Sequence, residues 1–246
     1  MTDKMIKGGL IGHGISNSLT PALHESEGQA QGLNYSYQSF DVATPAFDGW
    51  SFSRLLSHAE AKGFAGVNVT HPFKNTAFAL CDELSETASA LGAVNTIVFR
   101  NGRREGHNTD YIGFRSALRN AHNLGSLQNV LLLGAGGAGG AVALALVDQG
   151  VQNLTICDPA AGKSYELAVR LQRLRPRANI LAISRIEIAD DFSGVVNATP
   201  LGMATHPGVA IDPNLLSRRA WVGDIVYFPL ETELLRRSRD RGLATL

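Results

Sequence analysis

An uncharged segment of eighteen residues, VLLLGAGGAGGAVALALV at positions 130–147, constrains the fold of this chain more than any other stretch. Its length and its small-xxx-small spacing are within reach of a marginal transmembrane helix. However, five of the seven residues from Gly134 to Gly140 are glycines, and glycine destabilises the middle of a helix. We therefore predict a strand, a glycine turn and a helix.

Short and nearly continuous apolar runs follow this segment. Strands of that kind are buried on both faces, as in a parallel doubly wound sheet. We expect strands at 129–134, 153–158, 179–184, 194–200 and 220–227, and helices at 111–122, 138–150 and 164–175. This pattern predicts a Rossmann-type dinucleotide-binding domain over residues 111–246.

The first half of the chain also alternates between predicted strands and predicted helices. We expect strands at 7–12, 35–42, 64–70 and 93–100, and helices at 20–32, 52–63 and 85–92. Thr20 and Ser85 are expected to cap their helices, the first with Pro21 at the first helical position. The chain is therefore assigned to the α/β class, with an N-terminal α/β domain at residues 1–110.

Composition excludes some classes of partner. Lysine plus arginine number 22, and so do aspartate plus glutamate, which gives no electrostatic reason to expect nucleic acid or an anionic membrane. The two cysteines, Cys81 and Cys157, are far apart and give no disulfide framework. The first residues, MTDKMIKGG, lack the apolar segment of a signal peptide. We expect a cytoplasmic protein.

The glycine turn has the spacing Gly134-x-Gly136-x-x-Gly139 between a predicted strand and a predicted helix. In that context the motif predicts a pyrophosphate held by backbone N–H groups at the start of the helix. Asp158 ends the next predicted strand, where its carboxylate would accept hydrogen bonds from the adenosine ribose. The alternative is a tight turn that only packs a helix on a strand.

Lys74 is conspicuous because the chain has few lysines, and because it follows an apolar strand pattern that breaks at Thr70. The residues needed for zinc-assisted alcohol oxidation are missing from the chain, and so is the tyrosine–lysine pair of the short-chain dehydrogenases. The cysteines offer no zinc ligands at a workable spacing, so no metal is expected, and no tyrosine has a lysine four positions further on. Lys74 is therefore either a solvated loop residue or a catalytic amine at a strand end.

Asp110 lies where the two halves join, and Asn95 lies near another strand. Ligands of α/β proteins bind beyond the carboxyl ends of strands and often at domain junctions. Lys74 and Asp110 could there share a proton with a substrate hydroxyl, because removing hydride from an alcohol requires loss of the hydroxyl proton. A structural salt bridge between them is the alternative.

Ser18 and Thr20 lie just ahead of a predicted helix. Their hydroxyl groups, together with the helix N-terminus, form a neutral anion site that suits a carboxylate. Plain capping of the helix by Thr20 is the alternative, and it is compatible with the binding role.

Seven motifs follow one another in order along the chain: SLTP from Ser18, NVTHPFK from Asn68, GAVNT from Gly92, GHNTDYIGF from Gly106, GAGGAGG from Gly134, NATPLGM from Asn197 and DIVYFPLET from Asp224. Together they make the chain resemble the shikimate dehydrogenases, and more closely their quinate/shikimate dehydrogenase branch. The resemblance spans nearly the whole chain and implies reversible, nicotinamide-dependent oxidation of the C3 hydroxyl of shikimate to 3-dehydroshikimate.

The same resemblance implies roles for individual residues. Lys74 and Asp110 form the catalytic pair in the substrate-binding domain, 1–110, and Ser18 and Thr20 hold the substrate carboxylate. The other implied substrate contacts are Thr70, Asn95 and Tyr227, and the implied cofactor contacts are Gly134, Gly136, Gly137, Ala138, Gly139, Asp158, Lys163, Asn197, Thr199 and Pro200.

Some positions depart from the common pattern of the family. Thr20 stands where many members have serine, which resembles the quinate-accepting branch. Asp158, in CDPAAGK, stands where NADP-dependent members carry Asn-Arg-Thr, so NAD is the expected cofactor, with NADP possible through Lys163. Members of the family continue past the position of GLATL into a final helix that supplies a substrate-contacting glutamine.

Other interpretations stay open. Aminoshikimate or quinate are alternative substrates, and a dinucleotide-binding regulator without turnover is an alternative function. A folate dehydrogenase-type enzyme would need the missing tyrosine–lysine pair. The expected partner is a small molecule, bound by a monomer or a homodimer.

Overall fold

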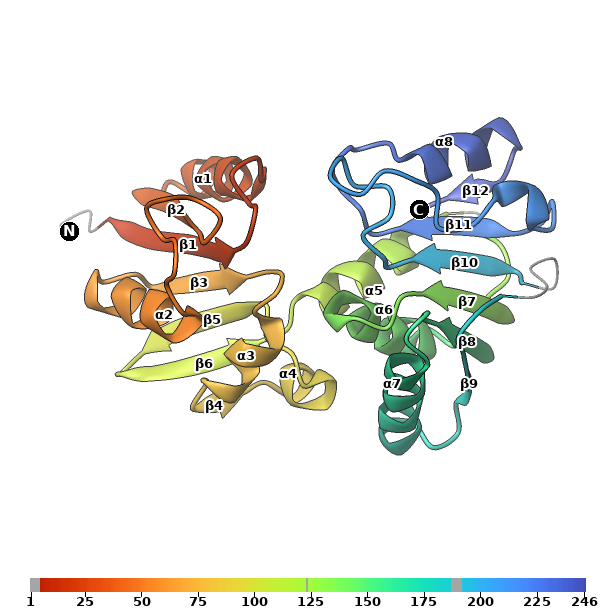
Figure 1. Ribbon diagram of the computed structural model, residues 1–246, viewed down its shortest axis with the longest axis horizontal. Coiled ribbons are helices and arrows are strands. Elements are labelled where there is room, and N and C mark those ends of the chain that lie inside the picture. The colour runs from red at the N-terminus through yellow and green to blue at the C-terminus, as the bar shows by residue number, and fades with distance from the viewer. Residues whose placement is uncertain (1–4, 123, 187–191) are drawn as a thin grey trace. The chain divides into compact units, whose positions relative to one another are not determined.

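Two six-stranded sheets organise the chain, one in each of two units that its internal contacts define, Met1–Thr109 and Asp110–Leu246. The computed structural model describes residues 5–122, 124–186 and 192–246. Figure 1 draws the first unit in red to yellow and the second in green to blue. The predicted boundary follows residue 110, whereas these units meet between Thr109 and Asp110.

The sheet of the first unit is mixed, with the strand order β2-β1-β3-β5-β6-β4. The first three strands are parallel, β5 is antiparallel to both of its neighbours, and β4 is parallel to β6. In chain order the elements are β1 Ile6–Gly12, α1 Thr20–Ala30, β2 Tyr35–Asp41, α2 Phe52–Ala61, β3 Gly66–Val69, α3 Lys74–Ala79, β4 Glu83–Leu84, α4 Glu86–Leu91, β5 Thr96–Arg100 and β6 Arg103–His107.

Alternation along β2 gives this sheet an apolar cluster on each face. Phe40 is fully buried in the larger cluster, which the amphipathic helix α2 completes with residues at helical spacing. Tyr37 points to the opposite face, where His24 of α1 stacks on its ring at a centroid distance of 4.5 Å. Both faces of this sheet therefore carry packed side chains.

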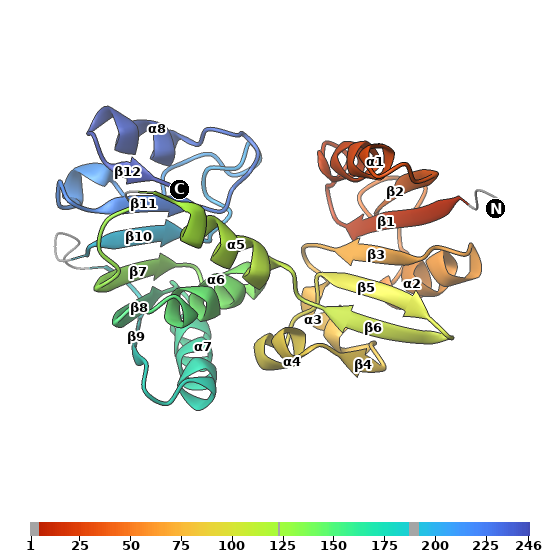
Figure 2. The same cartoon turned by 180° about the vertical axis from the view of Figure 1, so that it is seen from behind.

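The sheet of the second unit is entirely parallel, with the order β12-β11-β10-β7-β8-β9. Figure 2 shows α5 and α6 lying side by side over one face of it. The prediction of a parallel doubly wound sheet is confirmed. In chain order the elements are α5 Asp110–Asn120, β7 Asn129–Leu133, α6 Gly137–Asp148, β8 Asn153–Cys157, α7 Ala161–Leu174, β9 Asn179–Ile183, β10 Gly194–Asn197, the 3-10 helix η1 Pro213–Leu215, β11 Trp221–Asp224, α8 Glu233–Asp240 and β12 Ala244–Thr245.

The uncharged segment at 130–147 forms the predicted strand, turn and helix, because β7 ends at Leu133 and α6 begins at Gly137. No helix in the described part of the chain has the length and apolar character needed to cross a membrane.

Each unit contains one of the two tryptophans of the chain. In the first unit, Trp50 is partly buried, and the Arg54 guanidinium lies 3.8 Å from its ring centroid. In the second, Trp221 is fully buried, its ring fills the space that a side chain at Gly194 would need, and its Nε1 donates to the Ser126 carbonyl at 3.0 Å.

Several local predictions differ from the structure. Thr20 is the first residue of α1, and the N-cap is Leu19, whose side chain makes no capping hydrogen bond. The strand predicted at 93–100 begins only at Thr96, and the strand predicted at 220–227 ends at Asp224. By contrast, Ser85 caps α4 as predicted, since its hydroxyl accepts a hydrogen bond from Ala88 N at 3.2 Å.

Candidate active site

The turn that follows β1 presents Ser18 and Thr20, both partly buried. The Ser18 hydroxyl donates to Thr20 Oγ1 at 3.0 Å and accepts from Thr20 N at 3.2 Å. This pairing satisfies the N–H of Thr20, which does not cap α1 because it is already the first helical residue, after the N-cap Leu19. It also places two hydroxyl groups side by side at the N-terminus of α1, as an anion site would require.

Asp41, the last residue of β2, holds this turn in place. The residue is only 4% exposed, and its carboxylate accepts hydrogen bonds from Gly14 N, Ile15 N and the Ser16 hydroxyl at 2.7–2.8 Å. A fourth hydrogen bond comes from Ala43 N at 3.0 Å. Burial by itself raises the pKa of Asp41, but these four donors outweigh it and lower the pKa below its usual value. The turn is therefore built around an ionised carboxylate.

The turn that follows β3 lies against the turn that follows β1. Thr70 N donates to the Ile11 carbonyl at 3.0 Å, and His13 N donates to the His71 carbonyl at 3.1 Å. Lys74 is the first residue of the short helix α3, and it is partly buried. The carboxyl ends of two neighbouring parallel strands therefore bring the Ser18–Thr20 pair and the Thr70–Lys74 turn to one edge of the sheet.

Asn95 connects this edge to the end of the first unit, and its side chain is 8% exposed. Its Oδ1 accepts from Thr109 N at 2.9 Å, and its Nδ2 donates to the Thr109 hydroxyl at 2.9 Å. Its neighbour Val94 donates its N–H to the Lys74 carbonyl at 3.0 Å, and Asn95 O accepts from Val69 N at 2.7 Å. Asn95 thus fixes Thr109, the residue before Asp110.

A chain of side-chain hydrogen bonds continues from Asn95 across the sheet. Thr96 Oγ1 donates to Asn95 Oδ1 at 3.0 Å and accepts from Asn68 Nδ2 at 3.0 Å. Asn68 Oδ1 in turn accepts from the Tyr37 hydroxyl at 2.6 Å. Burial raises the pKa of Tyr37, so this hydroxyl keeps its proton and acts as the donor.

The remaining predicted substrate and proton-transfer residues belong to the second unit. Asp110 is the first residue of α5 and is partly buried. Tyr227 lies beyond the end of β11 and is 59% exposed. The structure therefore gathers Ser18, Thr20, Thr70, Lys74 and Asn95 within the first unit.

The glycine turn of the second unit fits the cradle of a dinucleotide pyrophosphate. Gly134 has a φ of +96°, and a β-carbon there would lie 2.8 Å from the Ala198 carbonyl oxygen. A β-carbon at Gly139 would collide with the Gly134 carbonyl oxygen. Gly136 is the exposed N-cap of α6, and a β-carbon there would meet no atom within 4 Å. Two glycines thus permit close packing, and the third leaves the helix N-terminus open to an anion.

Asp158 follows β8 and already has two partners. Its Oδ2 accepts from Ala135 N in the glycine turn at 2.9 Å, and its Oδ1 accepts from Ala160 N at 2.9 Å. A carboxylate has about four lone-pair sites, so both oxygens retain capacity for ribose hydroxyls. Lys163 is exposed in the first turn of α7.

The predicted cofactor residues divide by exposure. Gly137 and Pro200 are exposed, and Ala138 and Thr199 are partly buried. Asn197 is fully buried, and its amide makes hydrogen bonds to Thr199, Leu201 and Asp224.

Sequence reasoning missed Asp41, which holds the turn before Ser18, and the pair of Asp224 and Thr232. The Thr232 hydroxyl donates to Asp224 Oδ2 at 2.8 Å, and Asp224 also accepts from the predicted cofactor residue Asn197. Asp224 and Thr232 both lie inside the motif DIVYFPLET, which was the available signal for them. Asp41 had a weaker signal, because it is only a carboxylate near the end of the strand predicted at 35–42.

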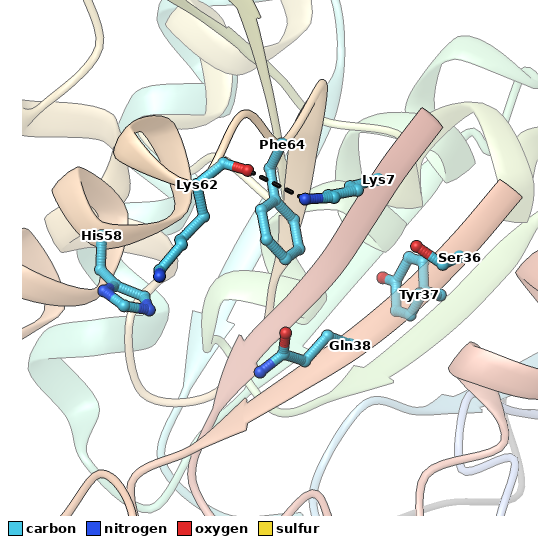
Figure 3. Close-up of a pocket in the computed structure, with 7 residues that line it drawn as sticks. All are labelled: Lys7, Ser36, Tyr37, Gln38, His58, Lys62 and Phe64. Atoms are coloured by element: carbon cyan, nitrogen blue, oxygen red, sulfur yellow. Dashed lines mark hydrogen bonds between the residues drawn. The ribbon is translucent and has the colours of Figure 1, made fainter. Parts of the chain in front are cut away.

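A pocket in the first unit meets the hydrogen-bond chain described above at Tyr37. Figure 3 shows its lining and the hydrogen bond from Lys7 Nζ to the Lys62 carbonyl, 3.2 Å long. None of the predicted site residues lines it, so the strand ends rather than this hollow define the candidate site. Its lining residues are Lys7, Ser36, Tyr37, Gln38, His58, Lys62 and Phe64. In the described ranges, no group of three or more histidine, cysteine, aspartate or glutamate side chains could hold a metal ion.

Comparison with known proteins connects this geometry to named relatives. The shikimate dehydrogenase substrate binding domain matches residues 10–97. The shikimate dehydrogenase (NADP(+)) of Arthrobacter sp. (strain FB24) is 44% identical over 241 residues, which are 97% of this chain and 82% of that protein. The quinate/shikimate dehydrogenase (NAD(+)) of Corynebacterium glutamicum (strain R) is 43% identical over 250 residues, covering 100% and 88%.

A solved structure has the same fold over nearly the whole chain. The quinate dehydrogenase from Corynebacterium glutamicum in complex with NAD matches with a TM-score of 0.91 and 43% identity. The match covers 99% of this chain and 88% of that one.

Proposed function

Since this chain belongs to the shikimate dehydrogenase family, we propose that it oxidises the C3 hydroxyl of shikimate to a ketone, reversibly, with a nicotinamide dinucleotide. In this proposal the first unit binds the substrate and the second binds the cofactor. The observation that carries it is the meeting of the turns after β1 and β3, which brings the Ser18–Thr20 pair and the Lys74 turn to one sheet edge.

The hydroxyl groups of Ser18 and Thr20 donate to the substrate carboxylate. The Thr20 hydroxyl can donate its own proton to the anion while it accepts from Ser18. The Ser18 hydroxyl must first turn its single proton from Thr20 Oγ1 toward the anion. The four hydrogen bonds to Asp41 fix the turn before the substrate arrives. Less ordering is then required on binding, which favours affinity.

Lys74 handles the proton of the reacting hydroxyl. Its amine takes this proton while the C–H bond is broken, and the resulting ammonium stabilises charge on the oxygen. Asp110 orients the ammonium in this proposal. Support comes from Thr109, which Asn95 fixes through two hydrogen bonds and which immediately precedes Asp110.

The glycine turn and the start of α6 hold the pyrophosphate of the cofactor, which supplies the hydride acceptor when bound. Gly134 and Gly139 permit the close packing of strand and helix, and Gly136 exposes the helix N-terminus. Asp158 orders this turn through Ala135 N and accepts the ribose hydroxyls with its remaining lone pairs.

NAD is the preferred cofactor in this proposal, because an ionised Asp158 repels a 2′-phosphate. At about 4 Å and an effective dielectric near 20, one like-charge pair costs about 4 kcal/mol before screening. Solvent and Lys163 reduce this to a preference of roughly ten- to a hundredfold in kcat/KM. Asp158→Ser should shrink the preference chiefly by improving NADP, as kcat/KM with each cofactor would measure. An unchanged cofactor ratio in the variant would refute this role.

The function itself is tested by following the absorbance of reduced nicotinamide. Shikimate, quinate and aminoshikimate are each tried with NAD and with NADP, and shikimate with NAD is expected to give the highest kcat/KM. Quinate is expected to be accepted too, because Thr20 resembles the quinate-accepting branch. If the dinucleotide binds but no substrate is oxidised, the chain is a regulator without turnover.

The place of the protein in the cell follows from the same proposal. It would serve the biosynthesis of aromatic amino acids in the cytoplasm, where the two unpaired thiols of Cys81 and Cys157 would stay reduced. We keep a monomer or a homodimer as the expected assembly.

A further inference from the structure

One carboxylate in the second unit joins three separate segments. Asp224 is the last residue of β11, and its Oδ1 accepts from Asn197 Nδ2 at 3.0 Å and from Val226 N at 3.0 Å. Its Oδ2 accepts from the Thr232 hydroxyl at 2.8 Å. Asn197 ends β10 and is the direct partner of Asp224 in the sheet register. Both Asn197 and Thr232 are fully buried.

Two of these partners lie on either side of the segment that carries Tyr227. Val226 and Thr232 are both buried, whereas all five residues between them, 227–231, are exposed. Thr232 is further fixed as the N-cap of α8, where its hydroxyl accepts from Leu235 N at 3.3 Å. A single carboxylate therefore fastens both ends of the 227–231 loop.

The third partner extends the same network to the turn at 198–203. Asn197 Oδ1 accepts from Thr199 N at 3.0 Å and from the Thr199 hydroxyl at 2.6 Å, and Asn197 Nδ2 also donates to the Leu201 carbonyl at 2.9 Å. A β-carbon on Gly202 would lie 3.5 Å from Thr232 and 3.8 Å from Asp224 Oδ2. The 198–203 turn thus packs directly on the Asp224 network.

We propose that Asp224 is a positioning residue that sets the 227–231 loop and the 198–203 turn together, and so controls where Tyr227 meets the substrate. This inference rests on the proposed function and on the roles that the family resemblance implies for Tyr227 at the substrate and for Thr199 and Pro200 at the cofactor. Asp224 acts through hydrogen-bond geometry and contacts neither ligand itself.

Substitutions separate this role from plain stabilisation. Asp224→Ala removes all three hydrogen bonds and should raise the KM for shikimate about tenfold. Asp224→Asn should recover most of that loss, because its Oδ1 can still accept from Asn197 and Val226 while its Nδ2 donates to the Thr232 hydroxyl. Asp148→Ala is the matched control. Asp148 also accepts three hydrogen bonds, from Tyr111 and Arg175, but holds neither loop.

A double-mutant cycle with Tyr227→Phe gives the decisive kinetic readout. If Asp224 acts through Tyr227, Asp224→Ala should raise the KM for shikimate much less in the Tyr227→Phe background than in the wild type. An equal rise in both backgrounds, or an equal rise in Asp148→Ala, would overturn the proposal. Thr232→Val removes only the hydroxyl and serves as the second variant if Asp224→Ala fails to fold.

Amide hydrogen exchange tests the same inference without turnover. In Asp224→Ala, or in Thr232→Val, exchange should accelerate in both 198–203 and 225–232, whereas Asp148→Ala should leave these two segments unchanged. Acceleration in neither segment, or in one alone, would refute the coupling. If the wild type oxidises no substrate but the exchange result holds, the proposed function has failed and the coupling of the two loops stands.

Discussion

Asp41 in the first unit and Asp224 in the second occupy corresponding places, each as the last residue of a parallel strand, yet their pKa values shift in opposite directions. Burial raises the pKa of both. At Asp41 four hydrogen bonds outweigh burial and lower the pKa, whereas at Asp224 three hydrogen bonds do not, and the pKa stays raised.

The opposite pKa shifts show that a buried carboxylate can order a loop at a strand end in two different electrostatic settings. The turn before Ser18 is organised by a carboxylate that is stable as an anion, with backbone N–H groups as three of its four partners. The 227–231 loop is organised by a carboxylate for which burial makes the charge costly. The turn before Ser18 therefore depends on the negative charge of Asp41, whereas the 227–231 loop depends more on the positions of the three hydrogen-bond donors around Asp224.

The largest expected effect compares one lysine from each unit. Lys74→Ala should lower kcat by about 10²–10⁴-fold, the usual contribution of a general acid–base group, with cofactor binding near normal. Lys163→Ala should leave kcat with NAD unchanged, because Lys163 is exposed in the first turn of α7. Steady-state kinetics would decide. A Lys74→Ala enzyme that keeps more than about a tenth of the wild-type rate would leave Lys74 without a part in proton transfer.

The second effect concerns the anion site of the first unit. Thr20→Ala and Ser18→Ala should each raise the KM for shikimate, since a hydrogen bond to a charged acceptor contributes roughly 1.5–3 kcal/mol. The KM for NAD should not change. The control is a substrate analogue without the carboxylate. If the variants lose as much affinity for this analogue as for shikimate, the anion site is excluded.

A third effect separates the two carboxylates by stability. Asp41→Asn should lower the free energy of unfolding at neutral pH by about 1–3 kcal/mol, because an amide oxygen cannot satisfy four donors. Asp224→Asn should cost less, because burial already disfavours its charge and its amide can donate to the Thr232 hydroxyl. Urea denaturation of both variants measures this difference, and equal losses would contradict the comparison.

The smallest effect is the pH dependence of those stability differences. Asp41 has a lowered pKa, so its contribution is present above about pH 4 and is lost as the pH falls through its folded-state value. Asp224 has a raised pKa, so its contribution is fully present below about pH 4 and is lost as the pH rises through its folded-state value.

Subtracting each variant from the wild type should therefore give opposite slopes. The unfolding free energy of the wild type minus that of Asp41→Asn should rise with pH, and the wild type minus Asp224→Asn should fall with pH. Denaturation curves between about pH 3 and pH 7 would reveal the signs. Two slopes of the same sign would show that the two carboxylates are not in contrasting states.

Local sequence signals predicted much of this fold. The glycines at 134–140, the capping Ser85 and the apolar runs of the second sheet each act within a few residues, so their effects can be read along the chain. β6 had no such signal, because its residues Arg103–His107 include no large apolar side chain. Its place depends on pairing with β5 and on the ion pair of Arg104 with Glu60, 2.6 Å long.

In the candidate site, too, the roles that depend on residues far away in sequence could not be predicted. Motifs identified Ser18, Thr20 and Lys74, but the capping role expected of Thr20 was wrong, because Thr20 is already the first helical residue and Leu19 is the N-cap. The roles of Asp41 and Asp224 depend on donors that lie up to 27 residues away in sequence. A strand-end aspartate that faces solvent has the same local sequence, so only the tertiary structure distinguishes the two cases.

The two tryptophans give the protein an intrinsic fluorescence reporter in each unit. Trp221 is sealed in an apolar core and should emit at shorter wavelength, whereas Trp50 is partly exposed beneath a guanidinium and should emit at longer wavelength. Trp50→Phe leaves a chain whose emission reports on the second unit, and Trp221→Phe leaves one that reports on the first. The order in which the two halves lose their structure can thus be read optically, without any attached dye.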